Sequence, residues 1–170
     1  KYQRMLEDRR AALQNMVQVA VGVLKHYDRQ VHQGIMPMAT AQEQARRAIG
    51  ELRYADKEYF YIFDMRPRMV LHPIKPELDG QDLSQIRDPD GKALFVAMRD
   101  VVSQQSSGFV DYQWPQPGQN EPAPKLAYAQ GFAPWGWVVA TGLYLDDLNA
   151  EFRHDAMMFV GKIVGLSLLL

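Results

Sequence analysis

Apolar residues recur with helical spacing along the first fifth of the chain. Between Tyr2 and about His32 there is no proline and a single glycine. The apolar positions follow steps of seven, four and three, and they are Leu6, Leu13, Val17, Ala20, Leu24, Tyr27 and Val31. This spacing predicts one long helix over residues 1–33 with a heptad seam. Such a seam packs either into the core, along a sheet, or against a second copy of the helix in a homodimer, with Leu13, Val17, Ala20 and Leu24 as contacts.

A second, shorter helix follows a clear break. Gly34 supplies a left-handed cap and Pro37 blocks continuation of the first helix. Thr40 and Glu43 have the spacing of a capping box, which predicts a second helix from there to about Leu52.

From residue 59 the pattern becomes that of strands. Residues 59–63 and 68–71 are rich in aromatic and β-branched side chains, which predicts a hairpin. Alternation along the first strand places Tyr59, Tyr61 and Phe63 on one face. Prolines at 73 and 76 end the second strand and leave a stiff loop that carries His72 and Lys75.

The remaining elements alternate between helix and sheet. We expect a helix at 92–104, strands at 109–114, 125–132 and 137–144, and a closing helix that begins at Asp146 or Asp147. A proline-rich loop at 115–124 joins the first two of these strands. Short connections favour an antiparallel sheet of five to six strands, with the helices packed on one side, in an α+β fold.

Composition narrows the classes of partner. The chain has 170 residues with 47% hydrophobic content, enough for one domain with a sizeable core. A net charge of −1 provides no basic surface for nucleic acid. The absence of cysteine excludes disulfides and thiolate chemistry.

The last stretch, residues 156–170, is almost wholly apolar. A membrane-spanning helix needs roughly 20 apolar residues, so this run predicts the beginning of a truncated transmembrane helix, with a buried helix of a soluble protein as the alternative. The domain itself is expected to span residues 1–155.

No familiar catalytic template is present. The chain contains no G-x-S-x-G, H-E-x-x-H, P-loop or G-x-G-x-x-G motif, and the four histidines show no spacing that suits a shared metal. We therefore interpret the chain as a binding module that requires no cofactor, and not as an enzyme.

Aromatic and cationic side chains on adjoining strands suggest a pocket for a small anion. The candidate ligand-binding residues are Tyr61, Phe63, Met69, His72, Lys75, Tyr112, Trp114, Lys125 and Tyr128. Apolar walls with a few polar groups are what a small-ligand site needs, and we expect Lys125, with a cationic His72 or Lys75, to neutralise a carboxylate. Lys125 and Tyr128 would face opposite sides of a regular strand, so a shared pocket requires a bulge.

Several linked motifs resemble the single Cache domain in its sCache_2 form. They are YFYIFD, RMVLHPIKPELDGQDL, DPDGKALF, GFVDYQWPQPG, PKLAY and FAPWGWVVATGLYLDD, which cover residues 54–150 in order. Family members usually read YFWIND where this chain has Tyr61 in place of Trp and Phe63 in place of Asn.

The resemblance implies a PAS-like sheet and a sensor domain in the periplasm, anchored in the inner membrane of a bacterial chemoreceptor. It also implies recognition of an organic acid such as acetate, propionate, pyruvate, lactate or malate. A histidine kinase or cyclase is an alternative output. A soluble enzyme that uses His72 as a general base is the hypothesis from a different class.

Overall fold

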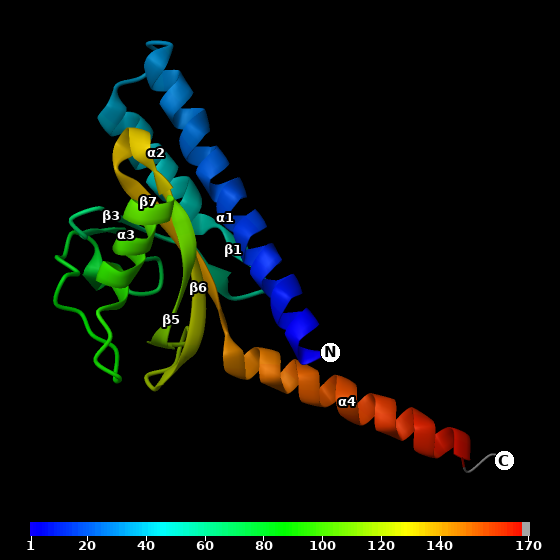
Figure 1. The fold of residues 1–170 in the computed structure, drawn as a ribbon. Helices are drawn as coiled ribbons and strands as arrows, with labels where there is room; N and C mark the ends of the chain where they lie inside the picture. The colour runs from blue at the N-terminus through cyan, green and yellow to red at the C-terminus, as the bar shows by residue number, and fades with distance from the viewer. Residues whose placement is uncertain (168–170) are drawn as a thin grey trace.

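The computed structural model describes residues 1–167, with side chains up to Phe159, as a sheet flanked by helices (Figure 1). A five-stranded antiparallel sheet has the order β4-β3-β7-β6-β5. The helices are α1 (Tyr2–His32), α2 (Met38–Glu51), α3 (Leu94–Gln105) and α4 (Leu145–Ser167). The strands are β1 (Arg53–Tyr54), β2 (Glu58–Tyr59), β3 (Tyr61–Asp64), β4 (Met69–Leu71), β5 (Ser107–Pro115), β6 (Pro122–Phe132) and β7 (Trp137–Tyr144). The predicted α+β fold with a long first helix and an antiparallel sheet is confirmed.

The hairpin of β5 and β6 is longer than the sequence suggested. Its register runs from Ser107 opposite Gln130 to Pro115 opposite Pro122, so the ladder absorbs both ends of the predicted 115–124 loop. Because Pro115 and Pro122 close the end of the hairpin, their missing N–H groups cost few ladder bonds.

The predicted strand at 59–63 is divided into two. Tyr59 pairs with Arg53 in a separate two-stranded sheet, whereas Tyr61 pairs with Ala140 of β7. Phe60 joins the core beneath α1, and Tyr59, Tyr61 and Phe63 share the opposite core, so the predicted alternation is preserved.

Helices α1 and α2 cover one face of the sheet. Leu13, Val17, Ala20 and Leu24 are buried within the single chain, where α1 packs on α2, β6 and β7. The prediction that these seam residues form a dimer contact is therefore wrong, and their alternative role in the core is confirmed. The prediction that Thr40 caps α2 is also wrong, because the helix starts at Met38 with Pro37 as its N-cap.

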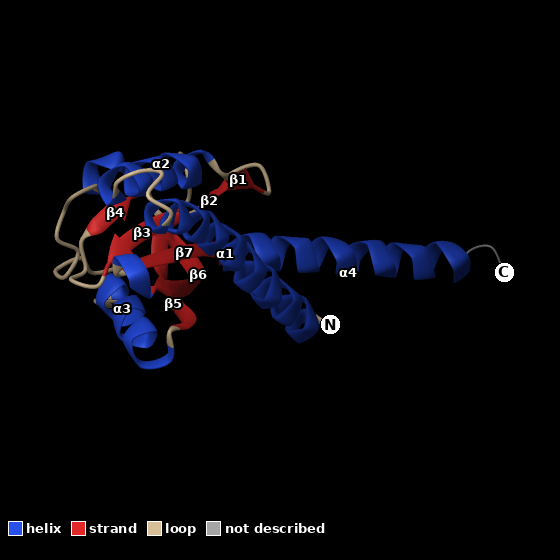
Figure 2. Ribbon diagram, turned by 90° about the horizontal axis from the view of Figure 1, so that it is seen from above, coloured by secondary structure: helices blue, strands red, loops and turns tan. Residues whose placement is uncertain are grey.

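Helix α3 covers the opposite face, which corrects the prediction that the helices pack on one side (Figure 2). The physical reason lies in the central strands. Seven of the eight residues of β7 are buried, so both of its faces are apolar and both need a cover.

Helix α4 continues from β7 without a loop and projects from the base of the domain (Figure 1). Leu148 in its first turns is buried, while Met157, Met158 and Phe159 are exposed. Within residues 1–167, no helix meets the length and hydropathy needed to span a bilayer. Residues 168–170 of the predicted membrane segment lie outside the described part, and the membrane anchor stays a prediction.

Candidate ligand-binding site

Eight of the nine predicted site residues lie together on the α3 side of the sheet. Six of them, all but Phe63 and Met69, belong to or border a group of rings around the Lys125 ammonium. We call this group the aromatic cage, and it consists of Tyr59, Tyr61, His72, Tyr112, Trp114 and Tyr144. Met69 and Phe63 pack in the same core behind it. The ammonium of Lys75 lies 5.1 Å from the centre of the Trp114 ring, at the edge of the cage.

Tyr128 is the exception. Strand β6 pairs with β7 in an unbroken register from Lys125 to Phe132, so no bulge changes the alternation. The ring of Tyr128 therefore points to the α1 side, where it packs on Phe109 with ring centres 4.9 Å apart. The structure does not bring Tyr128 together with the other eight residues.

Lys125 is a buried cation without an anionic partner. Its side chain is 1% exposed, and no carboxylate within the described residues forms an ion pair with it. The ammonium donates one hydrogen bond, to the Tyr59 hydroxyl at 3.2 Å, and lies 4.6 to 5.3 Å from the ring centres of Tyr59, Tyr61 and Tyr144. Burial lowers the pKa of Lys125 to about 7, although the charge of Glu58 acts in the opposite direction.

Small residues form the floor beneath Lys125. Ala127, Ala140 and Gly142 occupy neighbouring positions of β6 and β7. A Cβ added at Gly142 would lie 2.8 Å from Cε of Lys125 and 2.7 Å from the Leu126 carbonyl oxygen. Glycine at this position therefore gives the lysine side chain the space to lie flat across the sheet.

His72 is held as a neutral donor. Its ring Nδ1 accepts the backbone N–H of Lys75 at 3.0 Å, and the backbone N–H of His72 donates to Asp79 Oδ1 at 2.7 Å. With Nδ1 as the acceptor, the proton of the neutral ring belongs on Nε2. Burial lowers the pKa of His72 to about 3, helped by the charges of Lys125 and Lys75. The prediction of a cationic imidazolium is thus wrong, because the site is too dry and already carries an ammonium.

Paired hydroxyls complete the polar lining. Tyr61 and Tyr112 share a hydrogen bond of 2.7 Å between their hydroxyls, and Tyr61 also lies 3.5 Å from the sulfur of Met98. Burial raises the pKa of Tyr61 well above its ordinary value, so the phenol stays protonated and can donate. The described residues contain no cluster of three His, Cys, Asp or Glu side chains suited to a metal.

Sequence reasoning missed three members of this region. Tyr59 shares the alternation of Tyr61, so that pattern alone could have included it. Tyr144 lies opposite Lys125 in the pairing of β6 with β7, and Phe95 reaches the cage from α3, with its ring 5.8 Å from Trp114. No local sequence pattern indicates that Tyr144 contacts Lys125 or that Phe95 contacts Trp114.

Comparison with known proteins places this geometry in a family. The model of the family described as single Cache domain 2 matches residues 5–157. The methyl-accepting chemotaxis protein McpP of Pseudomonas putida is 46% identical over 159 residues, which cover 92% of this chain and 29% of McpP. The sensor histidine kinase MctS of Rhizobium johnstonii is 27% identical over 150 residues, covering 88% of this chain and 32% of MctS. The chain thus spans about a third of the length of these curated relatives.

Two solved structures are similar over most of the chain. One, titled as a periplasmic sensor domain of a chemotaxis protein, has a TM-score of 0.81 and 45% identity and covers 83% of this chain and 98% of its own. The other, whose title concerns carboxylic acid recognition by a Cache chemosensory domain, has a TM-score of 0.81 and 41% identity and covers 85% of this chain and 98% of its own. The chain belongs to the single Cache domain 2 family.

Proposed function

We propose that the chain is the periplasmic sensor domain of a transmembrane chemoreceptor and binds a mono- or dicarboxylate of two to four carbons in the aromatic cage. Residues 1–155 form the domain, and residues 156–170 begin the anchor in the inner membrane. The observation that carries the proposal is the buried, unpaired ammonium of Lys125. A buried charge without a counter-ion destabilises the empty protein, and an anionic ligand supplies the missing partner.

The cage offers a carboxylate three kinds of donor. The Lys125 ammonium forms the charged hydrogen bond, the His72 Nε2–H provides a neutral one, and the hydroxyls of Tyr61 and Tyr112 complete the lining. All of the surrounding rings except the half-buried Trp114 are buried, so they exclude water and strengthen each of these interactions.

The relatives support the same reading. A chemoreceptor is 46% identical to this chain, and a neighbour at 41% identity is a Cache domain whose title names carboxylic acid recognition. A sensor histidine kinase, 27% identical, represents the alternative output. An enzyme that uses His72 as a base is disfavoured because the lowered pKa makes this imidazole a weak base.

Calorimetry with a panel of acids tests the binding function. Acetate, propionate, pyruvate, lactate and malate are titrated into the wild-type chain, Lys125→Ala, and Lys25→Ala as a control on an exposed lysine of α1. We expect at least one acid to bind the wild type and the control equally, and Lys125→Ala to lose that binding. Binding of amines or neutral sugars but of none of these acids would refute the proposal, as would undiminished binding by Lys125→Ala.

Signal transmission follows from the junction of β7 and α4. Tyr144 is the last residue of β7, and the centre of its ring lies 5.2 Å from the Lys125 ammonium. Helix α4 begins at the next residue. A ligand that redirects Lys125 therefore acts on the residue that anchors α4, and it shifts the helix if it binds two positions of α4 unequally.

Because the seam is buried, a homodimer through α1 must use its outer face, where Met16 and Val19 are exposed. Cysteines placed at these two positions in the full-length protein in membranes should crosslink at rates that change with ligand. Equal rates with and without ligand at both positions would exclude this transmission while leaving the binding function intact.

A further inference from the structure

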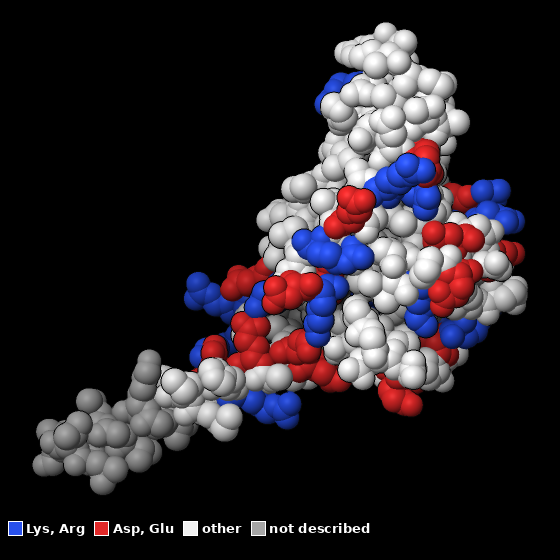
Figure 3. Space-filling view, turned by 180° about the vertical axis from the view of Figure 1, so that it is seen from behind, with Lys and Arg blue, Asp and Glu red and all other residues white. Residues whose placement is uncertain are grey.

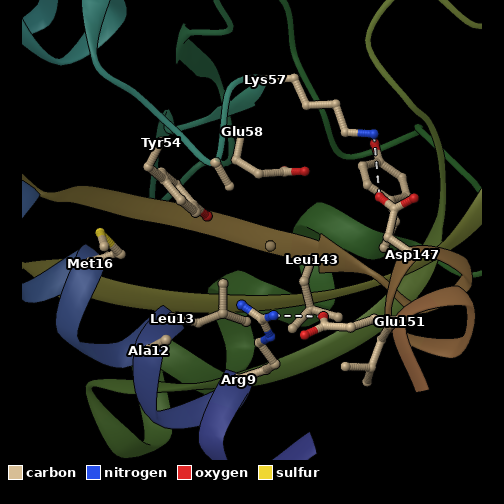
Figure 4. A pocket seen from close by; sticks show the side chains of 14 residues that line it. Arg9, Ala12, Leu13, Met16, Tyr54, Lys57, Glu58, Leu143, Asp147 and Glu151 are labelled. Carbon is tan, nitrogen blue, oxygen red and sulfur yellow. Dashed lines mark hydrogen bonds and ion pairs between the residues drawn. The ribbon is translucent and has the colours of Figure 1, made fainter. Parts of the chain in front are cut away.

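A groove lies next to the aromatic cage, at the base of the domain where α4 leaves, and Tyr144 belongs to both. It is a groove of about 520 Å³ between α1, the β1–β2 hairpin, β7 and the first turns of α4. Figure 3 shows acidic and basic side chains gathered on this part of the surface, and Figure 4 shows the groove from close by. Its lining residues include Leu13, Met16, Tyr54, Glu58, Leu143 and Leu148. None of the nine residues predicted to bind the carboxylate lines it.

Two ion pairs lie on the rim of the groove, and within each pair the positive and negative charges cancel. Lys57 contacts Asp147 at 3.3 Å, and Arg9 donates to Glu151 at 2.6 Å. Both pairs join α4 to the rest of the domain (Figure 4). The rim therefore has no net charge to offer a ligand.

Glu58 is the acidic residue of the groove lining that belongs to neither ion pair. It enters the groove from β2, and its side chain forms no hydrogen bond or ion pair within the described residues (Figure 4). Only 8% of the residue is exposed, and its carboxylate reaches solvent through the groove. Burial raises the pKa of this carboxyl group, although the charges of Lys125 and Lys57 act in the opposite direction.

The rest of the lining is largely apolar. Leu13, Leu143 and Leu148 form the walls together with the ring of Tyr54. The Tyr54 hydroxyl is engaged with Thr141 at 2.6 Å, so this residue presents its ring and not a free polar group. Apolar walls around one unpartnered carboxylate complement a ligand that has a hydrocarbon body and a single positive charge.

We propose that this groove binds a small organic amine, with its ammonium on Glu58 and its hydrocarbon body against Leu13 and Leu143. A metal ion is a poor alternative, because the described residues contain no group of three side chains able to hold one. The amine site shares Tyr144 with the carboxylate cage but differs from it in the charge of its ligand. A bound amine contacts the first turns of α4 and thus the same helix that follows β7.

Calorimetry with hexylamine tests this site, with hexan-1-ol as the neutral probe of the same length. We expect the wild-type chain to bind hexylamine at least about tenfold more tightly than hexan-1-ol, because the ammonium forms a charged hydrogen bond with Glu58 and the hydroxyl only a weaker one. This comparison needs no variant and does not depend on how a substitution folds. Equal affinities, or no binding of hexylamine, would overturn the proposal.

Two matched variants then locate the site. Glu58→Gln should weaken hexylamine binding by about tenfold or more, whereas Glu51→Gln, an exposed glutamate at the end of α2, should leave it unchanged. Circular dichroism confirms that both variants fold. Lys125→Met should retain hexylamine binding even if carboxylate binding is lost, which separates this site from the cage. Full hexylamine affinity in folded Glu58→Gln would overturn the assignment.

Discussion

Replacing Lys125 by methionine should abolish carboxylate binding and, at the same time, make the empty protein more stable. Methionine keeps the length and most of the packing of the side chain but removes the buried charge. A pKa depressed from 10.5 to about 7 corresponds to a free-energy cost of about 5 kcal/mol for keeping the lysine charged in the fold. The lost hydrogen bond to Tyr59 and the lost contacts with aromatic rings offset about 2–3 kcal/mol of this gain. We therefore expect the free energy of unfolding to rise by about 2–3 kcal/mol at pH 6.

The pH dependence gives this prediction its control. Between about pH 7 and 10.5 the unfolded chain holds more protons on Lys125 than the folded chain does, so wild-type stability from this group rises with pH. The advantage of Lys125→Met should shrink over that range. Urea unfolding of wild type, Lys125→Met and the exposed control Lys25→Met at pH 6 and pH 10 measures both effects. A less stable Lys125→Met at pH 6 would show that the lysine is a structural cation and would refute the reasoning.

Three further outcomes follow from the same site. Carboxylate affinity should fall as pH rises above about 7, because Lys125 then loses its proton, and calorimetry between pH 6 and 9 measures this; a flat profile would exclude the ammonium as the partner. Gly142→Ala should destabilise the fold by about 1–3 kcal/mol through overpacking, whereas Gly22→Ala on α1, which has open space, should not destabilise it in thermal melts. Tyr61→Phe should cost about 1–3 kcal/mol in urea unfolding because it leaves the buried Tyr112 hydroxyl without its partner, and an unchanged midpoint would contradict this.

Local sequence patterns were sufficient for the four helices, for the strands of the five-stranded sheet and for the orientation of side chains on a strand, but not for the separate β1–β2 sheet. Alternation correctly placed Tyr61 and Phe63 on one face, and it also indicated that Tyr128 would leave the Lys125 side unless a bulge intervened. The heptad spacing of α1 correctly identified its buried stripe. These features depend on residues a few positions apart, so they can be derived from the sequence.

The neighbours of each side chain could be identified only from the tertiary structure. Both faces of β7 are apolar, so the pattern alone could not determine that α3 covers one face and α1 the other. The sequence also could not decide whether the apolar seam of α1 packs in the core or in a dimer. Only the position of β6 and β7 beneath the seam shows that it belongs to the core.

Charge states likewise depended on tertiary structure. His72 is a cation by sequence expectation, yet burial beside Lys125 and Lys75 keeps it neutral. Lys125 becomes unusual only when Tyr59, 66 positions earlier, and Tyr144 of the neighbouring strand enclose it without a carboxylate. The sequence by itself determined which residues carry the chemistry and which way they point along their strands. The tertiary structure decided which of them meet and which are charged, because desolvation and pairing arise from contacts between residues far apart in the chain.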